Sequence, residues 1–168
     1  QLLDTYNQIF QISKHTRFSG HQNKSVDVPY YSTFFETNAD YKKVILEIIG
    51  KLFSNFLDSH LQQYKIIQAN IFNKPPGTGY VCPHQNLTTV DETRFTSVSI
   101  WAPLQSTNAL NGTLYLSPKS HKKFSKYRNH NIDWEPLKVL ENFEDYKMLS
   151  VNMNVGDVLV FDDSIVHG

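Results

Sequence analysis

Two histidines that lie far apart in the sequence, His84 and His167, have the surroundings expected of metal ligands. His84 stands in Pro83-His84-Gln85-Asn86, and alternate residues of a strand point to the same side, so His84 and Asn86 can face one site. A later strand that leads to His167 could bring the second imidazole beside them. Two imidazoles and a carboxylate on one face of an octahedral ion leave three positions open, as in non-haem Fe(II) oxygenases. The sequence therefore predicts an iron site in which an amide, Asn86, stands where a carboxylate is expected.

The elements that must position these residues are helical in the first third of the chain and extended afterwards. Asn38 is predicted to cap a helix that runs to about Ser59, because apolar residues recur there at intervals of three and four. A shorter helix is expected over residues 2–10. Strands are then expected at residues 64–72, 79–84, 95–103, 112–117, 149–152 and 157–162, with turn-forming residues between them. This order indicates an α+β fold, mainly β, with an antiparallel sandwich or barrel.

Composition excludes several classes of function. A chain of 168 residues, 40% of them hydrophobic, can bury one sizeable core, and a single domain over residues 1–168 is expected. Sixteen basic and sixteen acidic residues cancel, so no overall field would recruit nucleic acid or an anionic membrane. No apolar stretch is long enough to span a bilayer. The single cysteine excludes an internal disulfide framework and fits a reducing compartment such as the cytoplasm. The sequence does not indicate an oligomeric state.

Four segments of the chain form a wider pattern around the two histidines. They are, in order, Asn73-Lys74-Pro75-Pro76-Gly77 leading into Pro83-His84-Gln85-Asn86, Ser99-Ile100-Trp101-Ala102-Pro103-Leu104, Asn111-Gly112-Thr113-Leu114-Tyr115-Leu116-Ser117-Pro118-Lys119-Ser120-His121-Lys122, and Gly156-Asp157 through His167-Gly168. Together they resemble the phytanoyl-CoA dioxygenase-like family of Fe(II)- and 2-oxoglutarate-dependent oxygenases, and the likeness covers roughly residues 64–168. The third segment is the most specific, although Lys119 replaces the usual glycine of its bend.

The resemblance implies a double-stranded β-helix, a jelly-roll barrel over about residues 64–168 that is supported by helices over about residues 1–60. It also implies that His84, position 86 and His167 bind Fe(II), and that 2-oxoglutarate and dioxygen are consumed while a small molecule is hydroxylated. In the family an arginine beyond the distal histidine pairs with 2-oxoglutarate. We expect this arginine and a final strand to follow Gly168.

Asn86 leaves two interpretations open, because an amide offers a cation one carbonyl oxygen and no charge. In the first, Asn86 binds iron weakly and the two charges of 2-oxoglutarate help to hold the metal. In the second, the site is impaired and the fold binds a small molecule without turnover. Asp91 or Glu92 could in principle replace the missing carboxylate, although both are expected in the following loop.

Other candidates for contacts with the cosubstrate are weaker. Gln68 and Lys74 alternate with Asn70 and Phe72 along a predicted strand, and similar positions in the family approach 2-oxoglutarate or substrate. Lys74 could meet a carboxylate, although an ordinary surface lysine is the favoured interpretation.

Three residues of the later strands complete the set. Trp101 could line the site or belong to the core. Thr113 and Tyr115 share one face of their strand, and either hydroxyl could reach 2-oxoglutarate.

A short basic cluster, made of Lys122, Lys123, Lys126 and Arg128, is expected to be a solvated loop.

Overall fold

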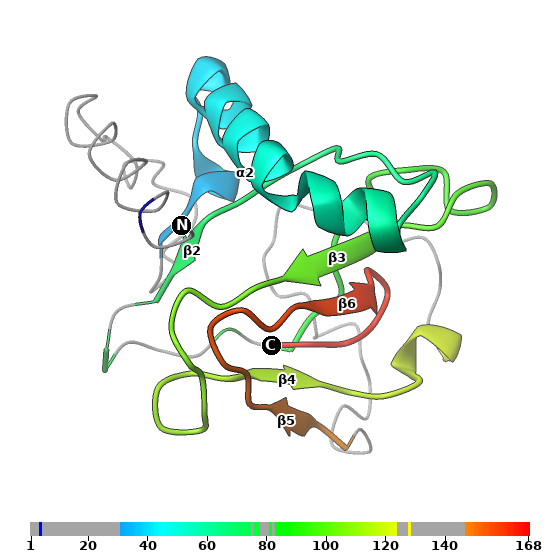
Figure 1. Cartoon of the computed structure of the whole chain (residues 1–168). Helices are drawn as coiled ribbons and strands as arrows, with labels where there is room; N and C mark the ends of the chain where they lie inside the picture. The colour runs from blue at the N-terminus through cyan, green and yellow to red at the C-terminus, as the bar shows by residue number, and fades with distance from the viewer. Residues whose placement is uncertain are drawn as a thin grey trace. The chain divides into compact units, whose positions relative to one another are not determined.

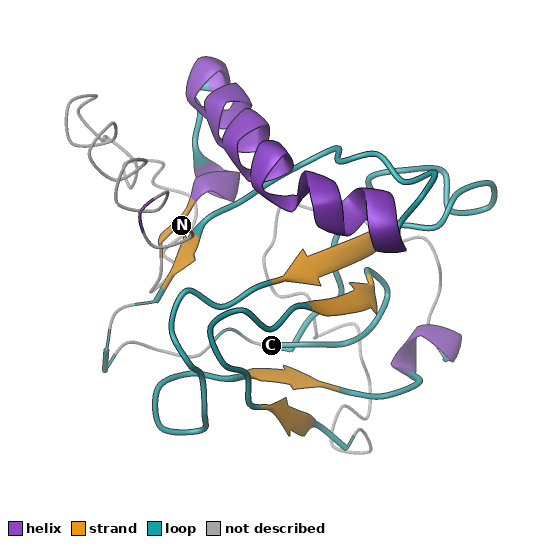
Figure 2. Ribbon diagram, viewed as in Figure 1, coloured by secondary structure: helices purple, strands orange, loops and turns teal. Residues whose placement is uncertain are grey.

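The computed structural model describes Asp4 and residues 31–74, 76–77, 81, 83–123, 128 and 147–168 (Figures 1 and 2). The chain divides into two compact units, Gln1–Thr78 and Gly79–Gly168. The helix predicted over residues 2–10, apart from Asp4, and half of the strand predicted at 79–84 lie outside the described residues. No helix in the described part has the length and apolar character to cross a membrane. The single domain inferred from length stays a prediction.

The first unit is built on one long helix, α2, which spans Ala39–His60. Asn38 begins it, because its side-chain oxygen accepts a hydrogen bond of 3.0 Å from the backbone N–H of Tyr41. The apolar stripe buries Tyr41 and Ile45 together with Ile71, and these three form the core of the unit. The predicted helix is therefore confirmed, including its capping residue.

The strand predicted at residues 64–72 is wrong over most of its length. Only β2, Phe72–Asn73, is a strand, and it pairs antiparallel with β1, Tyr31–Ser32. Ala69 and Ile71 belong to the core around α2, whereas Gln68 and Asn70 are exposed. The alternation of apolar and polar residues that suggested a strand thus places Ala69 and Ile71 against the helix and leaves Gln68 and Asn70 exposed.

The second unit consists of antiparallel strand pairs. β3, Val98–Trp101, pairs with β6, Leu159–Asp162, so that Val98 lies opposite Asp162 and Trp101 opposite Leu159. β4, Leu114–Leu116, pairs with β5, Leu149–Val151. These four strands confirm the predictions at 95–103, 112–117, 149–152 and 157–162, although each is shorter than predicted. A closed barrel is not among the elements of the described residues.

The last three residues join separate parts of this unit. Tyr115 N–H donates to the Gly168 carbonyl at 2.9 Å, and Ser117 N–H donates to the Val166 carbonyl at 2.8 Å. On the other side, His167 forms an antiparallel bridge with His84. Residues 166–168 therefore lie between β4 and His84, and Figure 1 shows the end of the chain beside β4.

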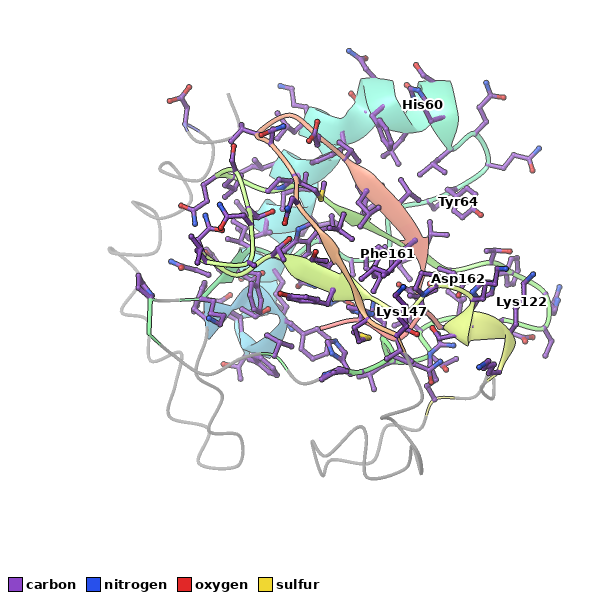
Figure 3. The ribbon with its side chains drawn as sticks, turned by 90° about the horizontal axis from the view of Figure 1, so that it is seen from below. His60, Tyr64, Lys122, Lys147, Phe161 and Asp162 are labelled. Atoms are coloured by element: carbon purple, nitrogen blue, oxygen red, sulfur yellow. The ribbon has the colours of Figure 1, made fainter. Side chains whose placement is uncertain are left out.

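The core of the second unit lies between these pairs. Its buried apolar side chains are Leu114, Met153, Phe161 and Val166, and Val166 is fully enclosed. Figure 3 marks Phe161 and Asp162, neighbours on β6 whose side chains alternate between the two faces of the strand. Burial of residues just before His167 holds that segment in place.

Candidate metal centre

The backbone brings His84 and His167 directly opposite each other. His84 N–H donates to the His167 carbonyl at 2.7 Å, and His167 N–H donates to the His84 carbonyl at 2.8 Å. Opposite residues of an antiparallel pair project from the same face, and the two ring centres are 4.3 Å apart. Two imidazoles that bind one ion at right angles through bonds of ~2.1 Å would have centres about 4.6 Å apart. The spacing of the pair thus fits a shared metal ion.

His167 presents a neutral ring with one nitrogen already used. The ring is buried, with only 6% of the residue exposed, and its Nδ1 lies 2.9 Å from the carbonyl oxygen of Ile165. A carbonyl only accepts, so Nδ1 carries the proton and Nε2 keeps its lone pair. Burial, and then the charge of His84, lower the pKa of His167 to about 4, against smaller opposite effects of Ile165 and Asp163. At neutral pH the ring is uncharged, as a metal ligand must be.

Asn86 is held by hydrogen bonds that define how its amide is turned. The amide nitrogen donates to Ser99 Oγ at 2.8 Å and to Asp163 Oδ1 at 2.9 Å. The backbone N–H of Asn86 donates to the Asp163 carbonyl at 3.0 Å. A carboxylate only accepts, so the NH₂ end must face Asp163 and the carbonyl oxygen is the atom left for a cation.

Asp163 is the residue of this site that the sequence analysis missed. It is 7% exposed, and its carboxylate accepts hydrogen bonds from Asn86, from Ser99 at 2.6 Å and from Ser97. The available signal was the alternation of Ser97 and Ser99 on one face of an apolar strand. Two hydroxyls on a buried face require a polar partner. That partner is Asp163, which directly follows β6. Its backbone N–H donates to the carbonyl of Ser97, the residue before β3, and this contact brings the carboxylate to the two hydroxyls.

Arg128 is buried at this site instead of lying in the exposed basic cluster predicted for it. Its guanidinium binds Glu92 at two points, Nη1 to Oε2 at 2.8 Å and Nη2 to Oε1, and Nε donates to the backbone carbonyl of Asn86. Its backbone N–H donates to Thr88 Oγ1 at 2.9 Å. A planar guanidinium matches a carboxylate in this two-point geometry, which explains the burial of both charges. Arg128 thus fixes the loop that follows His84.

These contacts also account for the two acidic residues considered as substitute ligands. Glu92 is engaged by Arg128. Asp91 accepts from the backbone N–H of Thr93 at 3.1 Å and from its hydroxyl, in a local turn. Neither contact brings a carboxylate to the histidine pair.

Trp101 shares a face with the polar residues of the site. It lies two residues beyond Ser99 on β3, and residues two apart on a strand project to the same side. Phe161, opposite Ser99, projects there too and contacts the His167 ring with centres 4.9 Å apart. Trp101 and Phe161 are therefore apolar side chains that can cover the site.

Thr113 and Tyr115 are turned away from the histidines. Thr113 and Tyr115 alternate with Leu116, which is paired with His167, so their side chains point to the opposite face of β4. The Thr113 hydroxyl donates to the Val151 carbonyl. Gln68 is exposed and Lys74 is half-buried, and both belong to the first unit, so a contact of either with the cosubstrate stays a prediction.

The candidate donors in the described part of the second unit are the two imidazoles and, as the predicted third ligand, the amide oxygen of Asn86. In the described residues no group of three His, Cys, Asp or Glu side chains is arranged to hold a metal. The residues present fit a divalent cation, with one formal charge fewer than a carboxylate would supply.

Comparison with known proteins gives a family and no individual relative. The family model for phytanoyl-CoA dioxygenase (PhyH) matches residues 10–168, which is nearly the whole chain. No curated protein matches the sequence, and no solved structure matches it.

Proposed function

Because the chain belongs to the phytanoyl-CoA dioxygenase (PhyH) family, we propose that it is an Fe(II)- and 2-oxoglutarate-dependent oxygenase that hydroxylates or otherwise oxidises a small molecule. The observation that supports this best is the pairing of His84 with His167, with ring centres 4.3 Å apart. We also propose that the strand pairs of the second unit belong to a jelly-roll barrel. The single cysteine is compatible with the cytoplasm, where we propose that the protein acts.

In this proposal the metal is held by the imidazoles of His84 and His167 and by the amide oxygen of Asn86. Bound iron would supply the activation of dioxygen, with 2-oxoglutarate converted to succinate and carbon dioxide as the substrate is oxidised. The Ile165 carbonyl keeps the proton of His167 on Nδ1, so Nε2 remains a ligand. Asp163 keeps the Asn86 amide oxygen turned away from itself.

Residues around the ligands would set the shape and dryness of the site. Arg128 donates to the backbone carbonyl of Asn86 and so fixes the position of that residue. The side-chain amide of Asn86 is therefore defined in position as well as in rotation. Phe161 packs against His167, and Trp101 lies on the same face of β3 and β6, so both can exclude water.

A neutral amide makes iron binding depend on the cosubstrate. Each tenfold loss of metal affinity corresponds to about 1.4 kcal/mol, and loss of an anionic ligand removes several such factors. The two negative charges of 2-oxoglutarate can offset part of this loss. We therefore expect Fe(II) to bind more tightly when 2-oxoglutarate is present, and anaerobic Fe(II) titration with and without it measures the difference.

The test of the function is succinate formation from 2-oxoglutarate with saturating Fe(II) and dioxygen. The unaltered protein should form succinate and His84→Ala should not. His60→Ala, an exposed histidine on α2, is the matched control and should retain the activity. No succinate from the unaltered protein, and none from the variant that combines Asn86→Asp with Asp163→Asn, would count decisively against the oxygenase.

A second candidate function is a binding protein that holds a small molecule without turnover. One observation favours it: both amide protons of Asn86 are already satisfied by Ser99 and Asp163, so the side chain is stable there without a metal. Succinate produced by the unaltered protein in proportion to an added substrate would exclude this alternative. Binding of that substrate with no Fe(II) affinity would support it.

A further inference from the structure

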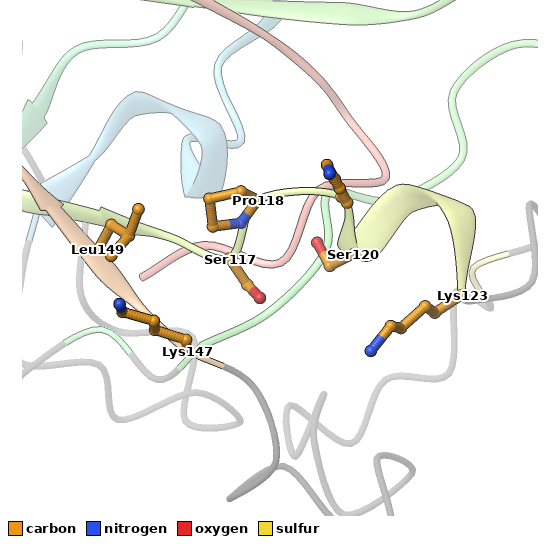
Figure 4. A pocket seen from close by; sticks show the side chains of 7 residues that line it. Ser117, Pro118, Ser120, Lys123, Lys147 and Leu149 are labelled. Carbon is orange, nitrogen blue, oxygen red and sulfur yellow. The ribbon is translucent and has the colours of Figure 1, made fainter.

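A cavity of about 350 Å³ lies at the end of β4, away from the residues of the metal centre. Its wall includes three lysines and two serines, Lys119, Lys123, Lys147, Ser117 and Ser120. Figure 4 labels all of these except Lys119. Among the described residues that line it, none carries a carboxylate. The described lining residues therefore carry a net positive charge, although the net charge of the chain is zero.

Two nearly fully buried hydroxyls lie in this cavity. Ser117 is 3% exposed, and its hydroxyl oxygen points into the space between Lys123 and Lys147 (Figure 4). The Ser117 hydroxyl makes no hydrogen bond to another described residue, so it can donate to a ligand in the cavity. Ser120 is 1% exposed, and its oxygen accepts from the Val166 N–H at 2.8 Å, so its own proton remains to be donated. The cavity thus offers O–H donors as well as cations.

Lys119 is held in a backbone conformation that lysine rarely adopts. Its φ is 69° and its ψ is 4°, in the left-handed region, where glycine would be free of strain. A strained residue with a long charged side chain on the rim of a cavity suggests a role for that side chain. The lysine at this position adds an ammonium group to the wall.

We propose that this cavity is a binding site for a phosphate group, separate from the metal centre. Lysine ammonium groups and serine hydroxyls are both donors, and charge-assisted hydrogen bonds to a phosphate are about twice as strong as neutral ones. The cavity is also tied to the metal centre. Ser117 and Ser120 both hydrogen-bond to the backbone of Val166, the residue before His167. A bound phosphate would therefore stiffen the segment that positions His167.

The test is a calorimetric titration of the metal-free protein with inorganic phosphate at constant ionic strength. The unaltered protein should show saturable binding, and Lys147→Gln and Ser117→Ala should each weaken it about tenfold, the loss expected for a hydrogen bond to a charged group. Lys119→Gly should weaken phosphate binding and at the same time raise Tm, because it removes a cation and relieves the backbone. A purely structural role for Lys119 does not give these opposite changes.

Lys122→Gln is the matched control. This exposed lysine lies on the short helix Ser120–Lys122, which directly follows Lys119, and it does not line the cavity. Its phosphate affinity should equal that of the unaltered protein. Phenyl phosphate distinguishes the source of the group: equal binding indicates the end of a larger molecule, and binding of inorganic phosphate alone indicates a free ion. The proposal is overturned by absence of saturable binding of both probes, or by the same affinity in Lys147→Gln and Lys122→Gln. Since no iron is present, these results do not depend on the oxygenase activity.

Discussion

At the scale of single residues, Asn86 is matched to its neighbour Asp163. An amide can donate to a buried carboxylate, whereas an aspartate at position 86 would place a second negative charge about 3 Å from the first. The amide at this place is therefore explained by the hydrogen bonds around it. It follows that changing residue 86 alone does not rebuild an ordinary carboxylate ligand.

We expect Asn86→Asp to lower the free energy of unfolding by about 1–3 kcal/mol, because it replaces a hydrogen bond with like-charge contact. The exchange Asn86→Asp with Asp163→Asn should recover this loss and bind Fe(II) at least tenfold more tightly than the unaltered protein. Urea unfolding and anaerobic Fe(II) titration of both variants provide the measurement. If the single variant is as stable and binds iron as well as the exchange, the matching of the two residues has no energetic importance.

The ion pair of Arg128 with Glu92 is the second residue-scale feature, and both side chains are largely buried. Removing one partner leaves a buried charge uncompensated, so Arg128→Met should cost about 3–5 kcal/mol of stability. Arg128→Lys keeps the charge and loses the two-point contact, and we expect an intermediate loss. Arg94→Met is the control. Arg94 is exposed and lies two residues after Glu92, and its replacement should change stability by less than ~0.5 kcal/mol. Equal stability of the Arg128 and Arg94 variants would contradict this account.

At the scale of elements, local signals and tertiary contacts contribute differently. α2 is capped at Asn38 by a hydrogen bond from Tyr41, and these two residues are only three positions apart in the sequence. β1 and β2 are two residues each and depend on pairing between distant parts of the chain. Tyr31 in β1 adds a polar contact, since its hydroxyl donates to Glu36 Oε1 at 3.3 Å.

Tyr31 makes this pairing sensitive to alkaline pH. Burial first, and then Tyr41 and Glu36, raise the pKa of Tyr31 above the ordinary value. Above pH ~10 the unfolded chain loses this proton while the folded chain keeps it, so stability falls as pH rises. Tyr31→Phe should reduce the loss of unfolding free energy between pH 9 and 11, roughly the range in which a free tyrosine ionises. Tyr64→Phe, at an exposed tyrosine, is the control, and an equal effect of both changes would refute the assignment to Tyr31.

At the scale of the whole molecule, the second unit depends on the close approach of chain segments from its two ends. Residues 166–168 pair with β4 on one side and with His84 on the other. Gly168 allows this approach, because a Cβ there would lie 2.7 Å from the Val81 carbonyl oxygen and 3.0 Å from Pro83 N. Both obstacles are backbone atoms, which cannot turn aside as a side chain can.

Gly168→Ala should therefore destabilise the protein by about 1–3 kcal/mol, as overpacking does, and should weaken Fe(II) binding by moving His84 relative to His167. Gly50→Ala is the contrasting control. Its Cβ would meet only the side chain of Ile66 at 3.4 Å, and alanine favours the helix by up to about 1 kcal/mol. Thermal unfolding and Fe(II) titration of both variants measure the effects. An unchanged Gly168→Ala protein would show that the approach is not tight.

Part of this protein can be derived from sequence because its causes are local. Asn38 and the apolar stripe predict α2, and alternating residues predict the existence of β3 to β6. The turn before β4 follows from Gly112, whose φ of 93° favours glycine. His84 and Asn86 were grouped by the two-residue repeat of a strand, which requires no knowledge of the fold.

Only the tertiary structure decided the partners of these residues, because the contacts join distant positions. Asn86 and Asp163 are 77 residues apart, and Arg128 and Glu92 are 36 apart. Charge and alternation along the chain do not specify which side chains meet, so Arg128 was expected in solvent and Asp163 was missed. The segment before β2 shows the same limit. Its alternation fits a strand or an irregular segment that packs on a helix equally well. The packing of Ile71 against Ile45 of α2 shows that the second applies.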